Sequence, residues 1–349
     1  MKYLIFLKKI VNYNKRRLLL NKLIILPSRN FIKYLSTNDN SSEIRDLGII
    51  SYNGNIKEGV DALQDRCTID KNTAVVFIIP SYKSQVKSLE TNKVEKKYLK
   101  NIISSEYQDE LQLNPQKHNW DFTVVNETKD KYKLLVSFTE KEYIENWISQ
   151  LIIADMEPSL VTVEQISILN AFYFHKGYKP IIAVDIGYVD TEIIIYDRDK
   201  EFFQMDIQIG GNDFTKNIKD IYDVNWDQAK EILKNPGKLE AIIGDKINEK
   251  PKLFKGVSSL VDNIIYEIKR SIIFYENRFR EIDFDEIMLV GGVSNLENIA
   301  WYLGYEIGAE VKKYNYFYNL EKDLKYDKKQ LLENNILTFS NLLGGALFK

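Results

Sequence analysis

The sequence predicts an α/β fold with two α/β regions and a small α+β subdomain inserted into the first region. Three observations carry this prediction. Apolar runs bounded by turn residues, such as Thr73–Ile79, are typical of strands buried on both faces. From about Tyr82 the chain turns polar and shows its own strand and helix patterns. The second half contains buried strands that end in glycine-rich turns.

Bulk composition excludes several classes of protein. The 349 residues suffice for more than one domain, and 48 basic residues nearly balance 50 acidic ones. This balance gives no general attraction to nucleic acid, so we expect no nucleic-acid partner. A single cysteine, Cys67, excludes an internal disulfide and fits a reducing compartment. With only two histidines, a Cys/His metal site is not expected.

The first 25 residues carry seven basic side chains and no acidic one. Their apolar runs fall short of the ~20 residues of a spanning helix. Neither the apolar core nor the cleavage site of a signal peptide is clear. Two readings stay open: a basic helix on an anionic membrane surface, or a solvated extension before the first strand.

Apolar spacing predicts the elements of the first region and the insert. In the first region we expect strands at Lys22–Leu26 and Thr73–Ile79, with a helix at Asn55–Cys67 between them. In the insert and just after it, we expect a helix at Lys93–Leu113, a hairpin of Trp120–Val125 and Lys131–Phe138, a helix at Glu140–Ala154 and a strand at Ser159–Val163.

The second half continues the alternation of strands and helices. The expected helices are Gln165–His175 (closed by Gly177), Asp213–Tyr222, Leu253–Phe279, Asn295–Ile307 and a last one around Leu342–Leu347. The expected strands are Pro180–Asp185, Glu192–Tyr196, Glu201–Ile207 and Glu286–Val290.

The turn Asp185-Ile186-Gly187 ends a buried strand and leads into a hairpin. At such a turn, glycine allows a positive φ and a close approach of backbone N–H groups to a phosphate. The Asp185 carboxylate offers a ligand for hydrated Mg²⁺, and Thr191 on the return strand adds a hydroxyl. Alone, Asp-x-Gly is a weak signal, because many turns contain it.

Two later glycine pairs strengthen this interpretation. Gly210-Gly211 precedes a helix, and Gly291-Gly292 follows a buried strand, so each suits close approach to an anion or a flat base. On the long helix, Glu267 and Arg270 share a face and are candidates to reach a ribose or base. A tight strand-to-helix turn is the simpler explanation for each pair alone. Three such turns in this order favour a nucleotide cleft.

Taken together, these residues resemble the actin-like ATPases. The order Asp-Ile-Gly-x-x-x-Thr, Ile-Gly-Gly-Asn, the helix at 258–277 and Leu-Val-Gly-Gly is similar to the FtsA/PilM branch, and within it to the PilM family. The insert occupies the position that this branch uses, and the terminal Gly344-Gly345-Ala346-Leu347 resembles its closing helix. The resemblance implies an actin-like, ribonuclease-H-like two-domain fold, with ATP and Mg²⁺ as ligands.

The resemblance also implies domain limits. We expect a basic N-terminal extension at 1–21, a first subdomain at 22–81 that returns at 158–180 and 321–349, an insert at 82–157, and a second domain at 181–320.

One feature departs from the family pattern. Its N-terminal phosphate loop, Asp-x-Gly-x-x-x-x-Lys, corresponds here to 26–33, where Lys33 agrees but Leu26 replaces the aspartate and Ser28 the glycine. An apolar side chain cannot position Mg²⁺, and Pro27 lacks an N–H group. This change argues against hydrolysis and leaves open whether ATP binds.

The resemblance therefore implies a scaffold of type IV pilus assembly rather than a working enzyme. The expected partner is the N-terminal tail of a PilN-like bitopic membrane protein, with a pilus motor ATPase as a further candidate. Such a protein would lie in the cytoplasm at the inner-membrane face, held there through its partners. The alternatives are an active actin-like ATPase, a relative of acetate or sugar kinases, and a relative of the cytoplasmic part of a type II secretion protein.

Overall fold

The computed structural model describes residues 21–37, 44–52, 54–67, 69, 72–198, 201–234, 252–279, 281–296, 298–314, 317 and 324–348. The chain divides into two compact units. The first contains Met1–Lys179, Arg198–Phe202 and Tyr316–Lys349, and the second contains Pro180–Asp197 and Phe203–Asn315. The basic residues 1–20, for which two readings were open, lie outside the described residues.

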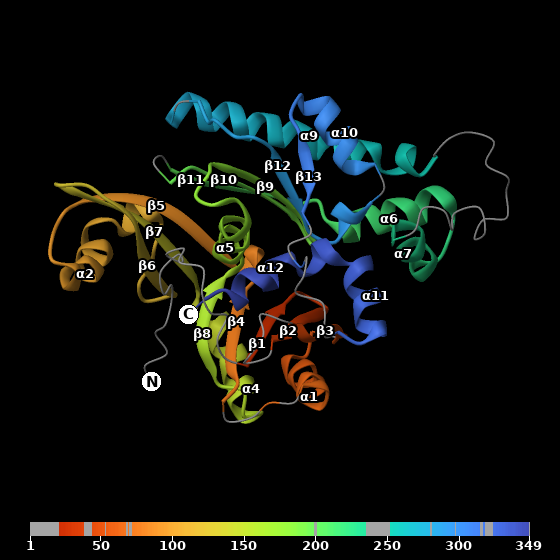
Figure 1. Ribbon diagram of the computed structural model, residues 1–349, viewed down its shortest axis with the longest axis horizontal. Coiled ribbons are helices and arrows are strands. Elements are labelled where there is room, and N and C mark those ends of the chain that lie inside the picture. The colour runs from red at the N-terminus through yellow and green to blue at the C-terminus, as the bar shows by residue number, and fades with distance from the viewer. Residues whose placement is uncertain are drawn as a thin grey trace. The chain divides into compact units, whose positions relative to one another are not determined.

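The first unit contains a five-stranded sheet in the order β3-β2-β1-β4-β8 (Figure 1). Its strands are β1 (Lys22–Pro27), β2 (Phe31–Thr37), β3 (Ile44–Ser51), β4 (Ala74–Ile79) and β8 (Pro158–Val163). β1 pairs antiparallel with β2 and parallel with β4, and β4 pairs parallel with β8. β2 and β3 were not predicted from sequence.

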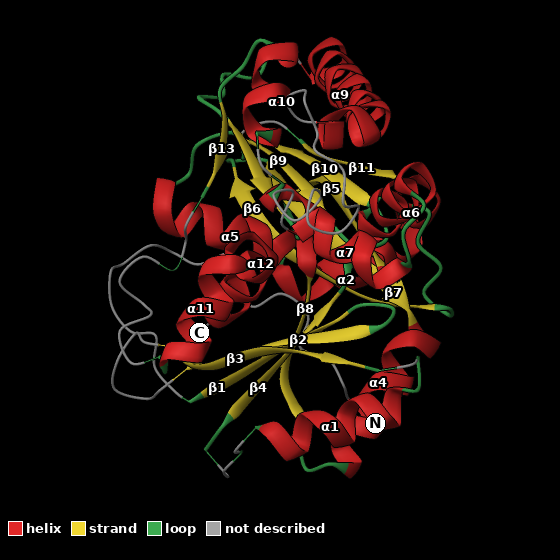
Figure 2. Cartoon of the chain, turned by 90° about the vertical axis from the view of Figure 1, so that its right-hand side faces the viewer, coloured by secondary structure: helices red, strands yellow, loops and turns green. Residues whose placement is uncertain are grey.

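Helices cover both faces of this sheet, with α1 and α4 on one side and α5 and α12 on the other (Figures 1 and 2). They are α1 (Ile56–Arg66), α4 (Lys141–Ile153), α5 (Glu164–Lys176) and α12 (Ile336–Ala346). The Asn55 side chain caps α1, and Gly177 ends α5 at a φ of 72°. The helix α11 (Tyr326–Asn334) adds an ion pair from Lys328 to Asp46 of β3 at 2.8 Å.

The α5–α12 contact depends on a small residue. A Cβ atom on Gly344 would collide with the Ser167 carbonyl oxygen, so only glycine allows the two backbones to approach this closely. The C-terminal helix is thereby packed into the first unit.

The insert forms a three-stranded sheet in the order β5-β7-β6. Its elements are β5 (Ser84–Asn92, after the 3₁₀ turn Ser81–Lys83), α2 (Lys96–Glu106), α3 (Gln108–Leu111), β6 (His118–Glu127) and β7 (Lys131–Glu140). β6 and β7 pair antiparallel, so the predicted hairpin is confirmed, and its register shifts between Val124 and Asn126.

One expectation for the insert was wrong. The single helix expected at Lys93–Leu113 is two helices that meet at Tyr107, and β5 precedes them. In addition, Trp147 of α4 packs on Phe77 of the five-stranded sheet, with ring centroids 5.7 Å apart. α4 therefore contributes to the core of that sheet.

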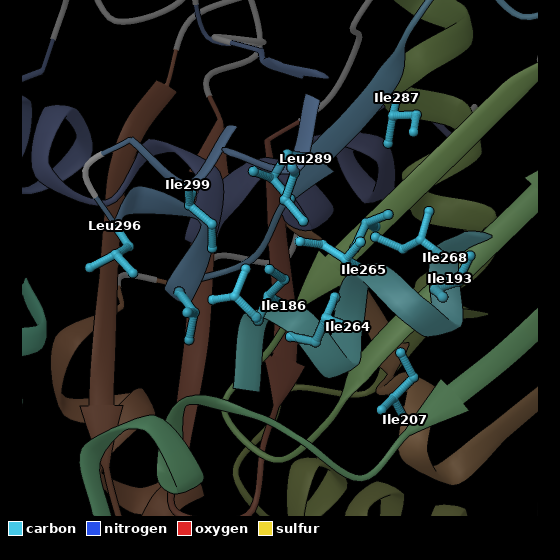
Figure 3. Packing of buried hydrophobic residues seen from close by; sticks show 14 of the residues in the cluster. Ile186, Ile193, Ile207, Ile264, Ile265, Ile268, Ile287, Leu289, Leu296 and Ile299 are labelled. Atoms are coloured by element: carbon cyan, nitrogen blue, oxygen red, sulfur yellow. The ribbon is translucent and has the colours of Figure 1, made fainter. Parts of the chain in front are cut away.

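The second unit contains the sheet β11-β10-β9-β12-β13. Its strands are β9 (Ile181–Ile186), β10 (Thr191–Tyr196), β11 (Phe202–Ile207), β12 (Ile287–Val290) and β13 (Val311–Lys313), and its helices are α6 (Gly211–Tyr222), α7 (Trp226–Lys234), α9 (Lys252–Phe279) and α10 (Ile299–Ile307). Figure 3 shows the core, where Ile186, Leu289 and Ile264 from β9, β12 and α9 come together. Burial of these apolar side chains is the main force that stabilises the second unit.

The helix expected at Asn295–Ile307 begins later than predicted. A 3₁₀ turn at Val293–Asn295 follows β12, and α10 begins at Ile299. Among the described residues, no helix has the length and apolar character needed to cross a membrane.

Candidate functional site

The Asp185 turn lies between the antiparallel strands β9 and β10. Thr191 pairs with Ile186 and Glu192 pairs with Asp185, and the Gly187 N–H donates to the Asp190 carbonyl at 2.9 Å. Asp185 is 6% exposed, so the sheet holds its carboxylate in a largely buried position.

A second carboxylate faces Asp185. Glu192 lies directly opposite it in the antiparallel ladder and is 1% exposed. Directly opposed residues of an antiparallel pair project to the same face of the sheet, ~5 Å apart. Glu192 was not among the site residues predicted from the sequence. The predicted hairpin could have indicated it, because it places the return strand beside Asp185.

Gly291, rather than Gly187, supplies the positive φ of the site. Gly291 has a φ of 89°, whereas the φ of Gly187 lies outside the left-handed range, which corrects the sequence interpretation. Val290 pairs with Asp185 across the parallel β12–β9 ladder. A Cβ atom on Gly291 would collide with Asp185 Oδ1 and the Ile186 carbonyl oxygen. Glycine is thus needed where the backbone touches the carboxylate.

Gly210 and Gly211 bring the start of α6 against the hairpin turn. The N–H groups of Gly211 and Asn212 donate to the carbonyl oxygens of Gly187 and Tyr188, both at 2.9 Å. The Gly210 N–H donates to the Asp213 carboxylate at 3.0 Å. A Cβ atom on Gly210 would lie 2.6 Å from the backbone nitrogen of Asp190.

These bonds change the interpretation of the first glycine pair. The N-terminal N–H groups that a bound anion would use already have partners within the protein. The close approach that the glycines permit is therefore between α6 and the hairpin.

Thr191 has a structural bond. Its hydroxyl donates to the Ile209 carbonyl oxygen at 2.7 Å, and the residue is fully buried. This bond ties β10 to the loop that precedes α6.

Glu267 and Arg270 form an ion pair of 3.0 Å on α9. The next residue, Ser271, donates to the Met205 sulfur of β11 at 3.2 Å. Ile264 and Ile268 of the same helix lie in one core cluster with Ile186, the neighbour of Asp185. The Arg270 guanidinium therefore already has a partner on its own helix.

The second glycine pair continues into the 3₁₀ turn. Gly292 is exposed with right-handed helical backbone angles, and the Ser294 hydroxyl donates to the Val290 carbonyl oxygen. Gly292 therefore presents its backbone to solvent beside the buried Gly291.

Lys33 belongs to the first unit, where it pairs with Leu26 across the β1–β2 hairpin. Leu26 is 1% exposed and lies in the core, so an apolar side chain fills the position expected to hold an aspartate. The turn is closed by the Ser28 N–H, which donates to the Phe31 carbonyl oxygen at 2.7 Å.

The described residues fit a nucleotide only in part. Within them, no group of three or more His, Cys, Asp or Glu side chains is arranged to hold a metal ion. Of the four charged residues predicted for the site, Glu267 and Arg270 pair with each other, and Asp185 and Lys33 belong to different units.

Comparison with known proteins identifies the fold and the family. A solved structure of a PilM–PilN type IV pilus biogenesis complex matches with a TM-score of 0.77 at 16% identity, over 94% of this chain and 98% of that one. The ethanolamine utilization protein EutJ from Carboxydothermus hydrogenoformans matches with a TM-score of 0.57 at 14% identity, over 95% and 93%. No curated protein sequence matches significantly.

These matches agree with the predicted fold, which is α/β and actin-like with two domains and an inserted α+β subdomain. The family described as type IV pilus assembly protein PilM matches residues 54–347. The chain therefore belongs to the PilM family of type IV pilus assembly proteins.

Proposed function

We propose that the chain is a scaffold of type IV pilus assembly that binds the N-terminal tail of a PilN-like membrane protein as an added strand. The observation that carries this proposal is the free edge of β8. β8 ends the order of the five-stranded sheet and pairs only with β4 among the described strands. In a parallel pair, alternate residues direct their N–H and C=O groups away from the partner strand.

The edge has the properties of a strand-binding site. Apart from the β4 ladder, no backbone hydrogen bond joins β8 to the described residues. Leu160, Thr162 and Val163 are nevertheless buried, and the Thr162 hydroxyl has no hydrogen-bond partner in the described part of the chain. Proteins normally cover or blunt such an edge, because it is a template for another strand.

An extended tail can reach the start of this edge. Pro158 and Ser159 of β8 are not buried, whereas Leu160–Val163 are, so a peptide that pairs along the whole strand must first displace what covers those four residues. It would then gain main-chain hydrogen bonds. Binding to a membrane protein's tail would hold the chain at the cytoplasmic face of the inner membrane. A pilus motor ATPase is a further candidate for contact.

The experiment uses a synthetic peptide of the N-terminal tail of a PilN-like membrane protein from the same organism. Two versions carry N-methyl groups on alternate residues, in opposite phases. We expect one phase to lose binding by about tenfold or more in calorimetry, because its N–H groups face β8, and the other phase to bind like the unmodified peptide. Equal binding of both versions would reject the added strand.

The nucleotide part of the proposal is a degenerate cleft. Its support is the buried Leu26 and the internal bonds of the α6 N-terminus. The alternative, an active ATPase, is favoured by the facing carboxylates of Asp185 and Glu192. Absence of binding in a calorimetric titration with Mg-ATP would reject the active ATPase, since turnover requires binding. If ATP binds, release of phosphate by the wild type and its loss in Asp185→Asn would reject the degenerate cleft.

A further inference from the structure

The outer side of α9 and α10 exposes four large apolar side chains. Tyr266 and Ile273 of α9 are 62% and 59% exposed, and Trp301 and Tyr305 of α10 are 67% and 71% exposed. We call these four residues the α9–α10 face. α10 lies beside α9 in both views (Figures 1 and 2), so the four side chains belong to one region of the second unit.

Helix geometry places these side chains on one side. Residues 266 and 273 are seven apart and therefore on the same face of α9, opposite the buried Ile264 and Ile268. The Tyr302 hydroxyl donates to Asp262 Oδ1 at 2.7 Å and fixes α10 against α9. Trp301 and Tyr305, on either side of Tyr302, stack with ring centroids 5.6 Å apart.

The charges around Tyr266 are self-complementary. Asp262 lies one turn before Tyr266 and Arg270 one turn after it, and both are exposed. Each also has a partner in its own chain, Tyr302 for Asp262 and Glu267 for Arg270, so a contact across the axis would be shared with these bonds. If two copies of α9 lie antiparallel about a twofold axis at Tyr266, Asp262 of each copy meets Arg270 of the other. The same surface patch on each copy is then complementary to itself, as an interface with twofold symmetry requires.

We propose that the α9–α10 face binds a second copy of this chain, with the twofold axis at Tyr266. At their exposed fractions the four side chains offer roughly 500 Å² per copy, so two copies bury roughly 1,000 Å². That area is at the lower limit for a specific interface, so the dimer is weak and depends on concentration. The proposal does not depend on the tail at β8.

Cross-linking tests the position of the axis. A Tyr266→Cys variant places two thiols on the axis, within the ~8–10 Å of a helix–helix contact, and a short bis-maleimide joins them. The matched control is Ile273→Cys, which has nearly the same exposure. It lies ~10 Å along the helix from the axis, so its two thiols are ~20 Å apart and remain unlinked.

The native thiol does not interfere with this comparison. Cys67 is half-buried, and burial raises its pKa to about 12, so it stays protonated and reacts slowly near neutral pH. Equal cross-linking of the two variants, or none of Tyr266→Cys at concentrations where the wild type sediments as a dimer, would overturn the proposed axis.

Charge reversal tests the pairing. Asp262→Arg alone and Arg270→Asp alone each place like charges across the axis, and we expect each to weaken self-association by about tenfold in analytical ultracentrifugation. A mixture of the two variants restores opposite charges at both contacts, so it should form a heterodimer with near wild-type affinity. The proposal fails if the mixture stays monomeric, or if the wild-type protein is a monomer at several hundred micromolar.

Discussion

The backbone of Gly291 lies against the carboxylate of Asp185. The contact joins β12 to β9 at the end of their parallel ladder, where Val290 pairs with Asp185. It also explains the first glycine of the Leu-Val-Gly-Gly segment, because a side chain there would strike Asp185 and the Ile186 carbonyl. Asp185 at the end of β9 and Gly291 at the end of β12 are therefore packed directly against each other.

We expect Gly291→Ala to reduce the free energy of unfolding by several kcal/mol. A positive φ costs a non-glycine residue about 1–2 kcal/mol, and the collision with Asp185 adds to that cost. Gly308→Ala is the matched control, since Gly308 has a φ of 80° but no heavy atom within 4 Å of the added Cβ. Chemical denaturation of both variants measures the difference, and equal losses would show that the collision relaxes without cost.

The Thr191 hydroxyl provides a second test of this turn. Thr191→Val removes its bond to the Ile209 carbonyl oxygen and leaves that oxygen short of a partner in a partly buried position. We expect a loss of about 1–3 kcal/mol in the free energy of unfolding. Thr191→Ser keeps the hydroxyl, so it should retain most of the stability that the hydrogen bond contributes. It loses only the contribution of the missing methyl group. A Val variant as stable as the wild type would show that the bond contributes little.

The sequence was informative where burial is continuous. β4 and β12 consist of unbroken apolar runs, and Asp185 alone interrupts the apolar run of β9, so the existence of these buried strands follows from composition. The strands that were not predicted contain both polar and apolar residues. β2 (FIKYLST) and β5 (SQVKSLETN) carry polar side chains on a partly solvated face, and β2 also overlaps the segment compared with a phosphate loop.

The roles of the glycines depend on tertiary contacts that spacing does not reveal. Sequence analysis identified Gly187, Gly210 and Gly291 as positions of close approach. It could not tell that Gly210 approaches the backbone of Asp190, or that the positive φ belongs to Gly291. Similarly, Glu267 and Arg270 share a helical face, but spacing alone could not tell that they pair with each other.

Lys22 gives the first unit a specific dependence on pH. Its ammonium group is buried and donates to the carbonyl oxygens of Ala346, at 2.7 Å, and Phe348. Burial lowers the pKa of Lys22 from 10.5 to about 8. Between these values the unfolded chain binds more protons than the folded chain, so this group makes stability rise with pH from about 8 to 10.5.

We expect Lys22→Met to remove this rise. The full effect is at most about 3–4 kcal/mol, because each unit of pKa shift corresponds to about 1.4 kcal/mol. Urea denaturation of the wild type and of Lys22→Met at pH 7, 8, 9 and 10 measures the slope. An unchanged slope in the variant would assign the pH dependence to other groups.

Asn341 completes the hydrogen bonding of a buried carboxylate. Glu164 is 6% exposed and accepts from the Asn341 amide at 2.6 Å and from the Ser81 N–H at 2.9 Å. Asn341→Leu removes the first donor, and we expect a loss of about 1.5–3 kcal/mol in the free energy of unfolding, because a charged group keeps only part of its hydrogen bonding. Adding Glu164→Leu removes the charge itself, so the double variant should be more stable than Asn341→Leu alone. Denaturant unfolding of both variants tests the sign of this coupling, and additive losses would mean that Asn341 stabilises the protein by packing instead.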